Sequence, residues 1–122
     1  MKLQTPLIIS VNLFNLIDCL TTIYGVNVLG FYEINSFARS LICSNQICYV
    51  LVKLIPFLFL SYLFCKLTST EKPLLIGMRI GLIIGFLFAI FVFSIASILN
   101  VLQIFGYDVS SVLLFIIRII PK

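Results

Sequence analysis

The stretch "LIGMRIGLIIGFLFAIFVFSIASILNVL", residues 75–102, is almost entirely apolar and holds one charged residue, Arg79. About 20 apolar residues in a helix cross the hydrocarbon core of a bilayer, since each residue adds about 1.5 Å against a thickness of about 30 Å. Two further runs of this kind occupy residues 6–29 and 47–65. Because lipid cannot hydrogen-bond an open backbone, the sequence predicts an all-α integral membrane protein with a bundle of three transmembrane helices.

The composition of the whole chain agrees with this class. Of the 122 residues, 62% are hydrophobic and 10% are charged, and the mean hydropathy is +1.27. A soluble domain usually has about a quarter of its residues charged. A soluble chain of this length could not bury so much apolar surface in its own core. We therefore expect residues 1–122 to form a single membrane domain, with the first run retained because no small-residue cleavage site follows it.

The connecting segments predict two shorter helices. Residues 31–46, "FYEINSFARSLICSNQ", place Phe31, Phe37 and Leu41 near one helical face, which is typical of an amphipathic helix lying at the membrane interface. Residues 108–120 are too short to span and predict an amphipathic C-terminal helix, with Gly106 breaking the chain before it.

The distribution of basic residues bears on orientation and on partners. With three spans, four basic residues lie on the side of the amino terminus and three on the other, which slightly favours a cytoplasmic amino terminus. The two sets are Lys2, Lys66, Lys72 and Arg79 against Arg39, Arg118 and Lys122. The net charge of +4 suits anionic lipid headgroups as partners, and the lack of a basic cluster argues against nucleic acid.

Polar residues lie inside the predicted spans. On the first span they fall within about a third of the helix circumference, so we expect this face to contact protein or a wet cavity rather than lipid. The face comprises Asn12, Asn15, Asp18, Cys19 and Thr22. Lys53 in the second span is predicted to pair with Asp18 or Glu33, and depth in the membrane favours Glu33. Alternatively, Lys53 extends to the headgroups without a partner. Asn100 lies near the end of the third span.

Small and sulfur-containing residues leave alternatives open. Gly77, Gly81 and Gly85 are spaced by four and predict close helix packing, either within the chain or with a partner. Cys43 and Cys48 could form a disulfide if their side of the membrane is oxidising. The sequence has no histidine and no phosphate-binding loop or nucleophile motif, so we expect no metal, no cofactor and no enzymatic activity.

The pattern Asn15-x-x-Asp18-x-x-Thr21-Thr22 followed by Gly30-x-x-Glu33-x-Asn35 resembles the signature of a small membrane family catalogued as domain of unknown function 5658. The resemblance covers roughly residues 8–103 and extends to a lysine in the second helix and an asparagine late in the third. This chain departs from the family pattern at Ser36, where proline is usual. The resemblance implies three spans and one polar constellation, and it carries no activity. Its members here are Asn15, Asp18, Thr22, Glu33, Asn35 and Lys53.

Three functions remain open at the level of sequence. The first is a non-catalytic accessory subunit that packs against larger membrane proteins. The second is a small homo-oligomeric transporter or ion channel in which Asn15 and Asp18 line the path. The third is a lipid-anchored assembly factor or scaffold that uses the segments 31–46 and 108–120 as interfacial anchors.

Overall fold

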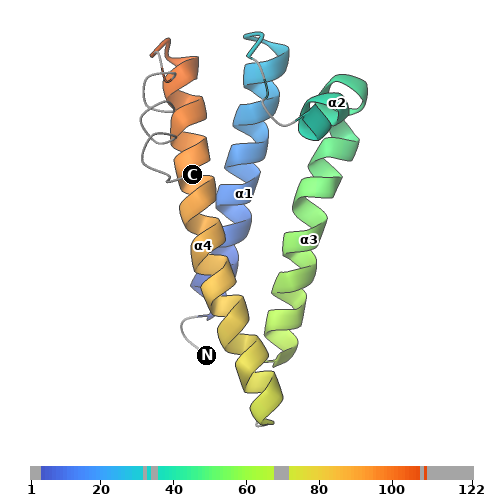
Figure 1. Cartoon of the computed structure of the whole chain (residues 1–122), viewed down its shortest axis with the longest axis vertical. Coiled ribbons are helices and arrows are strands. Elements are labelled where there is room, and N and C mark those ends of the chain that lie inside the picture. Colours follow the sequence, from blue (N-terminus) through green and yellow to red (C-terminus); the bar gives the residue numbers. More distant parts are fainter. Residues whose placement is uncertain (1–3, 32, 34–35, 68–71, 108, 110–122) are drawn as a thin grey trace, which may run out of the picture.

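The computed structural model describes residues 4–31, 33, 36–67, 72–107 and 109, and these residues form four helices. Helix α1 spans Gln4–Asn27, α2 spans Ser36–Ser44, α3 spans Gln46–Leu67 and α4 spans Pro73–Ile104. Three of them, α1, α3 and α4, are long and apolar enough to cross a membrane, so the prediction of three spans is confirmed. They run side by side, with α2 at one end of the bundle (Figure 1).

The helix ends follow from local sequence. Pro73 begins α4, where its missing N–H costs no hydrogen bond. At the other end of α4, Gly106 has a φ of 82°, its N–H donates to the carbonyl of Gln103, and the N–H of Tyr107 donates to that of Leu102. This is a Schellman motif, so the predicted break at Gly106 is confirmed. The predicted helix over residues 108–120 lies outside the described residues, except for Val109.

Helices α2 and α3 are separated by a single residue, Asn45. Its side-chain Oδ1 accepts hydrogen bonds from the N–H groups of Ile47 and Cys48 at 3.0 and 3.2 Å, which caps the start of α3. Its own N–H donates to the carbonyl of Leu41 in α2. The expected short helix between the first two spans is therefore present, although its position relative to a membrane stays a prediction.

The chain after α1 turns back over the end of that helix. The N–H of Phe31 donates to the carbonyl of Gly25 at 2.9 Å. A Cβ added to Gly25 would lie 2.5 Å from Cδ2 of the Phe31 ring, so only glycine admits this close approach. Phe31 was expected within the short helix over residues 31–46, but it precedes α2 and lies against α1.

An apolar core joins the three spans at the end where α1 begins and α3 ends. We call Leu7, Val11, Phe64 and Phe86 the apolar core. The Phe64 and Phe86 rings meet edge to face with centroids 5.5 Å apart, and Phe57 and Phe93 do so at 5.1 Å. Large apolar side chains elsewhere on the spans are exposed, as lipid-facing surfaces require.

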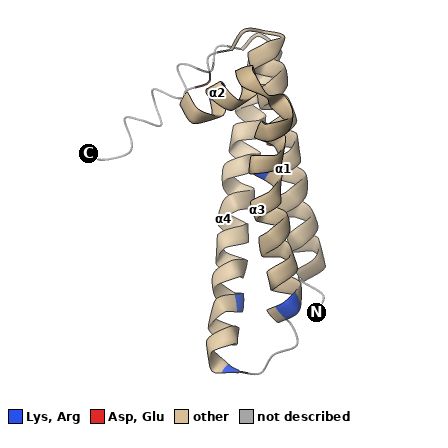
Figure 2. Ribbon diagram, turned by 90° about the vertical axis from the view of Figure 1, so that its right-hand side faces the viewer, with Lys and Arg blue, Asp and Glu red and all other residues tan. Residues whose placement is uncertain are grey.

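The basic residues Lys66, Lys72 and Arg79 lie near the end of the bundle where α3 ends and α4 begins, opposite α2 (Figure 2). These three residues of the sequence grouping therefore share one end of the bundle, and its fourth member, Lys2, lies outside the described residues. Which side of a membrane this is stays a prediction.

Candidate functional site

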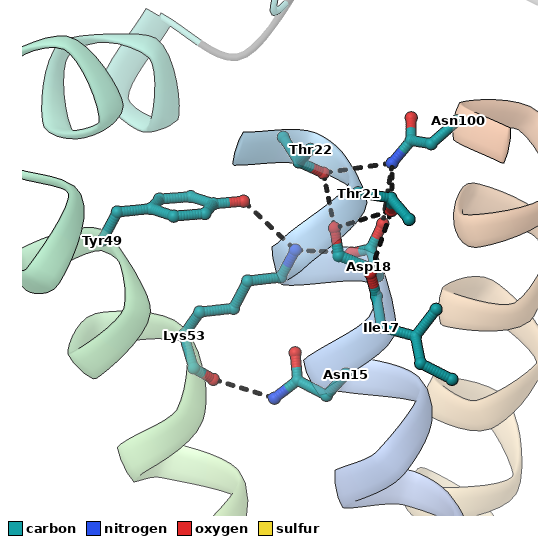
Figure 3. Close-up of polar contacts among 8 residues, drawn as sticks. All are labelled: Asn15, Ile17, Asp18, Thr21, Thr22, Tyr49, Lys53 and Asn100. Atoms are coloured by element: carbon teal, nitrogen blue, oxygen red, sulfur yellow. Dashed lines mark hydrogen bonds and ion pairs between the residues drawn. The ribbon is translucent and has the colours of Figure 1, made fainter. Parts of the chain in front are cut away.

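An ion pair joins α1 to α3 inside the bundle. Nζ of Lys53 lies 2.5 Å from Oδ2 of Asp18, and the two side chains are 19% and 9% exposed. The ammonium also donates to the hydroxyl oxygen of Tyr49 at 3.2 Å, one turn earlier on α3 (Figure 3). Both charges are thus paired where solvent is scarce, which offsets much of the cost of burying them.

Helix α4 contributes Asn100 to the same cluster. Its Nδ2 lies 3.3 Å from Oδ1 of Asp18, 3.2 Å from the hydroxyl of Thr21 and 3.1 Å from that of Thr22 (Figure 3). The two hydroxyls donate to backbone carbonyls of α1, at 2.9 Å to Ile17 and 2.7 Å to Asp18, so their oxygens are free to accept from the amide. We call Asp18, Thr21, Thr22, Tyr49, Lys53 and Asn100 the polar cluster.

The polar cluster corrects the expected partner of Lys53. Depth favoured Glu33, whereas Lys53 pairs with Asp18. The backbone carbonyl of Lys53 accepts a hydrogen bond from Nδ2 of Asn15 at 3.0 Å, which sets the Lys53 backbone about one turn from Asp18 along α1. The long lysine stem crosses that turn and brings the ammonium to the carboxylate.

A second polar contact between α1 and α3 lies apart from the polar cluster. Nδ2 of Asn12 donates to Oγ of Ser61 at 2.9 Å and to the carbonyl of Ile8. Asn12 was predicted on the same polar face of the first span as Asp18, but its partner Ser61 is two turns of α3 away from Lys53. Asn15, fully buried, lies between the two contacts and bonds the α3 backbone in the turn that contains Pro56.

Three contributing residues were missed from the sequence site: Thr21, Tyr49 and Ser61. On α3, Tyr49 precedes Lys53 by four residues and Ser61 follows it by eight. Tyr49, Lys53 and Ser61 therefore lie within about a third of the circumference of that helix. That shared face was the available signal. Tyr49 belongs to a small apolar cluster with Cys19 and Ile42, which ties α2 to both α1 and α3.

The polar cluster lies at one side of a cavity of about 500 Å³ at the α2 end of the bundle. All four helices contribute to its wall, and Glu33 does as well. The lining residues are Asp18, Thr22, Glu33, Phe37, Ala38, Leu41, Tyr49, Val52, Lys53, Ala96, Leu99, Asn100 and Gln103. We call this space the polar cavity. Glu33 thus shares a cavity with Asp18 and Lys53, while Asn35 lies outside the described residues.

Neither the cysteines nor the three glycines of α4, which we call the glycine row, belong to the polar cluster. Cys19 packs beside it, against Tyr49. A Cβ added to Gly77, Gly81 or Gly85 would meet nothing within 4 Å, so the row does not mediate close packing within the chain. The alternative of a partner contact stays a prediction. Cys43 and Cys48 are exposed free thiols here, and their disulfide also stays a prediction.

The chemistry available to the polar cluster is limited by its own contacts. Both carboxylate oxygens of Asp18 accept hydrogen bonds, and the pair with Lys53 has no net charge. Within the described segments, no group of three or more cysteine and acidic side chains could hold a metal ion. The cluster can therefore hold three helices in one register, and its polar cavity can admit a ligand.

Three helices of membrane-spanning length, held together by an ion pair between α1 and α3 and by the hydrogen bonds of Asn100 on α4, define a small polytopic α-helical membrane protein. The model of one family matches residues 9–106, and it is described as a domain of unknown function, DUF5658. The chain belongs to this family, as its motif indicated. Neither the curated proteins nor the solved structures contain a match to the chain.

Proposed function

We propose that this protein is a non-catalytic accessory subunit of a larger membrane assembly, in which its polar residues hold the bundle together and its lipid-facing surface contacts other subunits. The observation that carries this proposal is the internal pairing of Asp18. Lys53 on α3 and Asn100 on α4 satisfy its carboxylate, so one residue of α1 joins all three spans. Such pairing is typical of a structural role within membrane bundles.

The open glycine row supports a partner on α4. Gly77, Gly81 and Gly85 leave a shallow strip on a helix whose outward side chains are otherwise bulky, and small residues let the backbones of two helices approach closely. Gly81 also borders an apolar groove of about 350 Å³ between α3 and α4. The proposal places a helix of another membrane subunit against this strip. The alternative occupant is a second copy of the chain.

Purification in mild detergent followed by mass spectrometry tests the proposal. The expected result is co-purification of other membrane subunits in fixed ratio with the wild-type chain. Gly81→Trp should abolish it, whereas Leu58→Trp, on the exposed surface of α3, should leave it unchanged. Purification of the chain without other subunits, or equal loss of those subunits with Gly81→Trp and Leu58→Trp, would contradict the proposal. Purification with further copies of the same chain alone would show that the protein is a homo-oligomer.

The transporter alternative has a separate test. Reconstituted vesicles report ion or proton flux, and Asp18→Asn removes the charge while keeping a polar side chain of similar size. The accessory role predicts no flux in either form. A flux in the wild type that disappears in Asp18→Asn, with folding and partner binding intact, would overturn it.

A further inference from the structure

The apolar groove between α3 and α4 has the dimensions of a ligand site. Its volume of about 350 Å³ lies within the range of about 300–1,000 Å³ that small-molecule sites occupy. One charged side chain, that of Lys66, lines it near the end of α3. The other lining residues are Leu60, Leu63 and Leu67 of α3 and Met78, Gly81 and Leu82 of α4. A ligand matching this wall has an apolar chain and an anionic group.

Arg79 brings a second positive charge to the level of the groove. It lies in the sequence between the lining residues Met78 and Leu82. It also precedes the buried Phe86 by seven residues, or two helical turns, so the two side chains leave α4 on the same side. Helix α4 extends beyond the start of α1 (Figure 1), and at this level its neighbour is α3.

The guanidinium of Arg79 has no counter-charge within the described part of the chain. Its Nε is buried there without a hydrogen-bond partner. An arginine side chain stays protonated, and its N–H groups are costly to leave unpaired in hydrocarbon. This side chain therefore calls for an anionic partner from outside the described residues.

The surroundings of Lys66 place this end of the groove at the headgroup level. The Lys66 ammonium lies 5.7 Å from the centre of the Tyr62 ring, one turn earlier on α3, which is a cation–π distance. Both side chains are exposed. Tyrosine and lysine are typical of the zone where acyl chains meet headgroups.

The local charge selects an anion. Residues 66–79 carry a net formal charge of +2 (three basic minus one acidic), with Glu71, the acidic one, outside the described residues. The described lining of the groove holds no acidic side chain. A guanidinium binds a phosphate through two parallel hydrogen bonds, and basic residues between transmembrane helices suit lipid phosphates.

We propose that the groove binds a phospholipid of net negative charge, with its phosphate between Lys66 and Arg79 and one acyl chain along the leucine side chains of α3. The ammonium and guanidinium supply the attraction for the headgroup, and the groove excludes neighbouring lipids from the chain. The site uses neither Gly77 nor Gly85, so it does not depend on the accessory role.

Native mass spectrometry of the full chain tests the proposal. The protein is reconstituted in bilayer discs holding phosphatidylglycerol and phosphatidylcholine with the same acyl chains in equal amounts, and the lipid retained after transfer to detergent is measured. Each basic residue should favour the anionic lipid about fivefold, so the wild type should retain phosphatidylglycerol over phosphatidylcholine by about 25-fold. Equal retention of the two lipids would overturn the proposal.

Charge variants locate the headgroup. Lys66→Gln and Arg79→Gln should each reduce the preference for phosphatidylglycerol about fivefold, and the double variant should abolish it. Arg39→Gln, on α2 at the other end of the bundle, removes the same charge and should leave the preference unchanged. An equal effect of Arg39→Gln and Arg79→Gln would reduce the preference to net charge and contradict the site.

Two further measurements separate binding from folding. Met78→Trp fills the groove and should abolish retention of phosphatidylglycerol, whereas Ile80→Trp, on the exposed surface of α4, should not change it. In lipid-free detergent Arg79→Gln should be at least as stable as the wild type, because it removes a charge without a partner. Equal retention by the two tryptophan variants, or a less stable Arg79→Gln, would overturn the proposal.

Discussion

At the end where α1 begins, the three spans meet through the apolar core, whereas at the α2 end they meet through the polar cluster beside a cavity. In water both arrangements would be driven partly by the hydrophobic effect. In lipid, acyl chains cover apolar side chains equally well, so apolar contacts contribute packing and little else. The polar groups have no substitute partner in lipid, and they determine which helix faces meet. The more apolar end of this bundle is therefore not the end that determines which faces of the three helices meet.

Removing the charge of Lys53 is the strongest way to test this comparison. Lys53→Met keeps a long unbranched side chain but leaves Asp18 without its counter-charge, and we expect a loss of about 3 kcal/mol in the free energy of unfolding. Unfolding of the purified protein by a denaturing detergent measures it. The double variant Asp18→Asn/Lys53→Met should recover most of the loss. A single variant within about 1 kcal/mol of the wild type would contradict the importance of the polar cluster.

Truncating the apolar core should cost less. Phe64 is fully buried against Phe86, and in a water-soluble core Phe→Ala costs about 3–5 kcal/mol. Since lipid replaces water here, Phe64→Ala should lose mainly packing, about 2 kcal/mol in the same unfolding assay. Phe91→Ala, on the exposed surface of α4, is the matched control and should have almost no effect. If Phe64→Ala proves more damaging than Lys53→Met, the order of the two ends is reversed.

The contribution of α4 to the polar cluster should be smaller again. Asn100→Leu removes the amide that reaches Asp18, Thr21 and Thr22, and hydrogen bonds between membrane helices contribute about 0.6–2 kcal/mol. We expect a loss of about 1 kcal/mol. A double-mutant cycle with Asp18→Ala, which removes the acceptor, measures the coupling between the two side chains, and strictly additive losses would show that the 3.3 Å contact contributes nothing.

Two glycine substitutions give the smallest effects, and they should differ in sign. Gly81→Ala adds a methyl group into open space and removes a flexible residue from a helix interior, so it should be neutral or stabilise by about 0.5 kcal/mol. Gly25→Ala must displace the ring of Phe31 and should destabilise the turn after α1. The two unfolding free energies, compared with the wild type, check this, and a destabilised Gly81→Ala would reveal close packing at the glycine row.

Much of the fold could be predicted because hydropathy and span length are strong signals. The three spans were expected at residues 6–29, 47–65 and 75–102. The helices extend these ranges by one or two residues at five of the six ends, and α1 ends two residues earlier than expected. Gly106 likewise marked the end of α4, because a positive φ favours glycine.

The candidate site was harder to predict because helix positions along the sequence do not give relative heights in the bundle. Counting residues from the membrane face placed Lys53 nearer to Glu33, whereas the Asn15 contact fixes the register of α3 against α1 and the lysine stem reaches Asp18. Tyr49 was hidden for another reason: its ring is apolar enough to pass as part of the span, and only its hydroxyl joins the cluster.

The single-residue junction at Asn45 has a mechanical consequence. The Oδ1 of Asn45 caps α3, and its N–H donates to the carbonyl of Leu41 in α2. No flexible linker therefore separates α2 from α3. A rigid rotation of α3 would therefore also move α2, together with the Phe37 and Leu41 side chains that line the polar cavity. Such a rotation would change the contact between Lys53 and Asp18 and the shape of the polar cavity together.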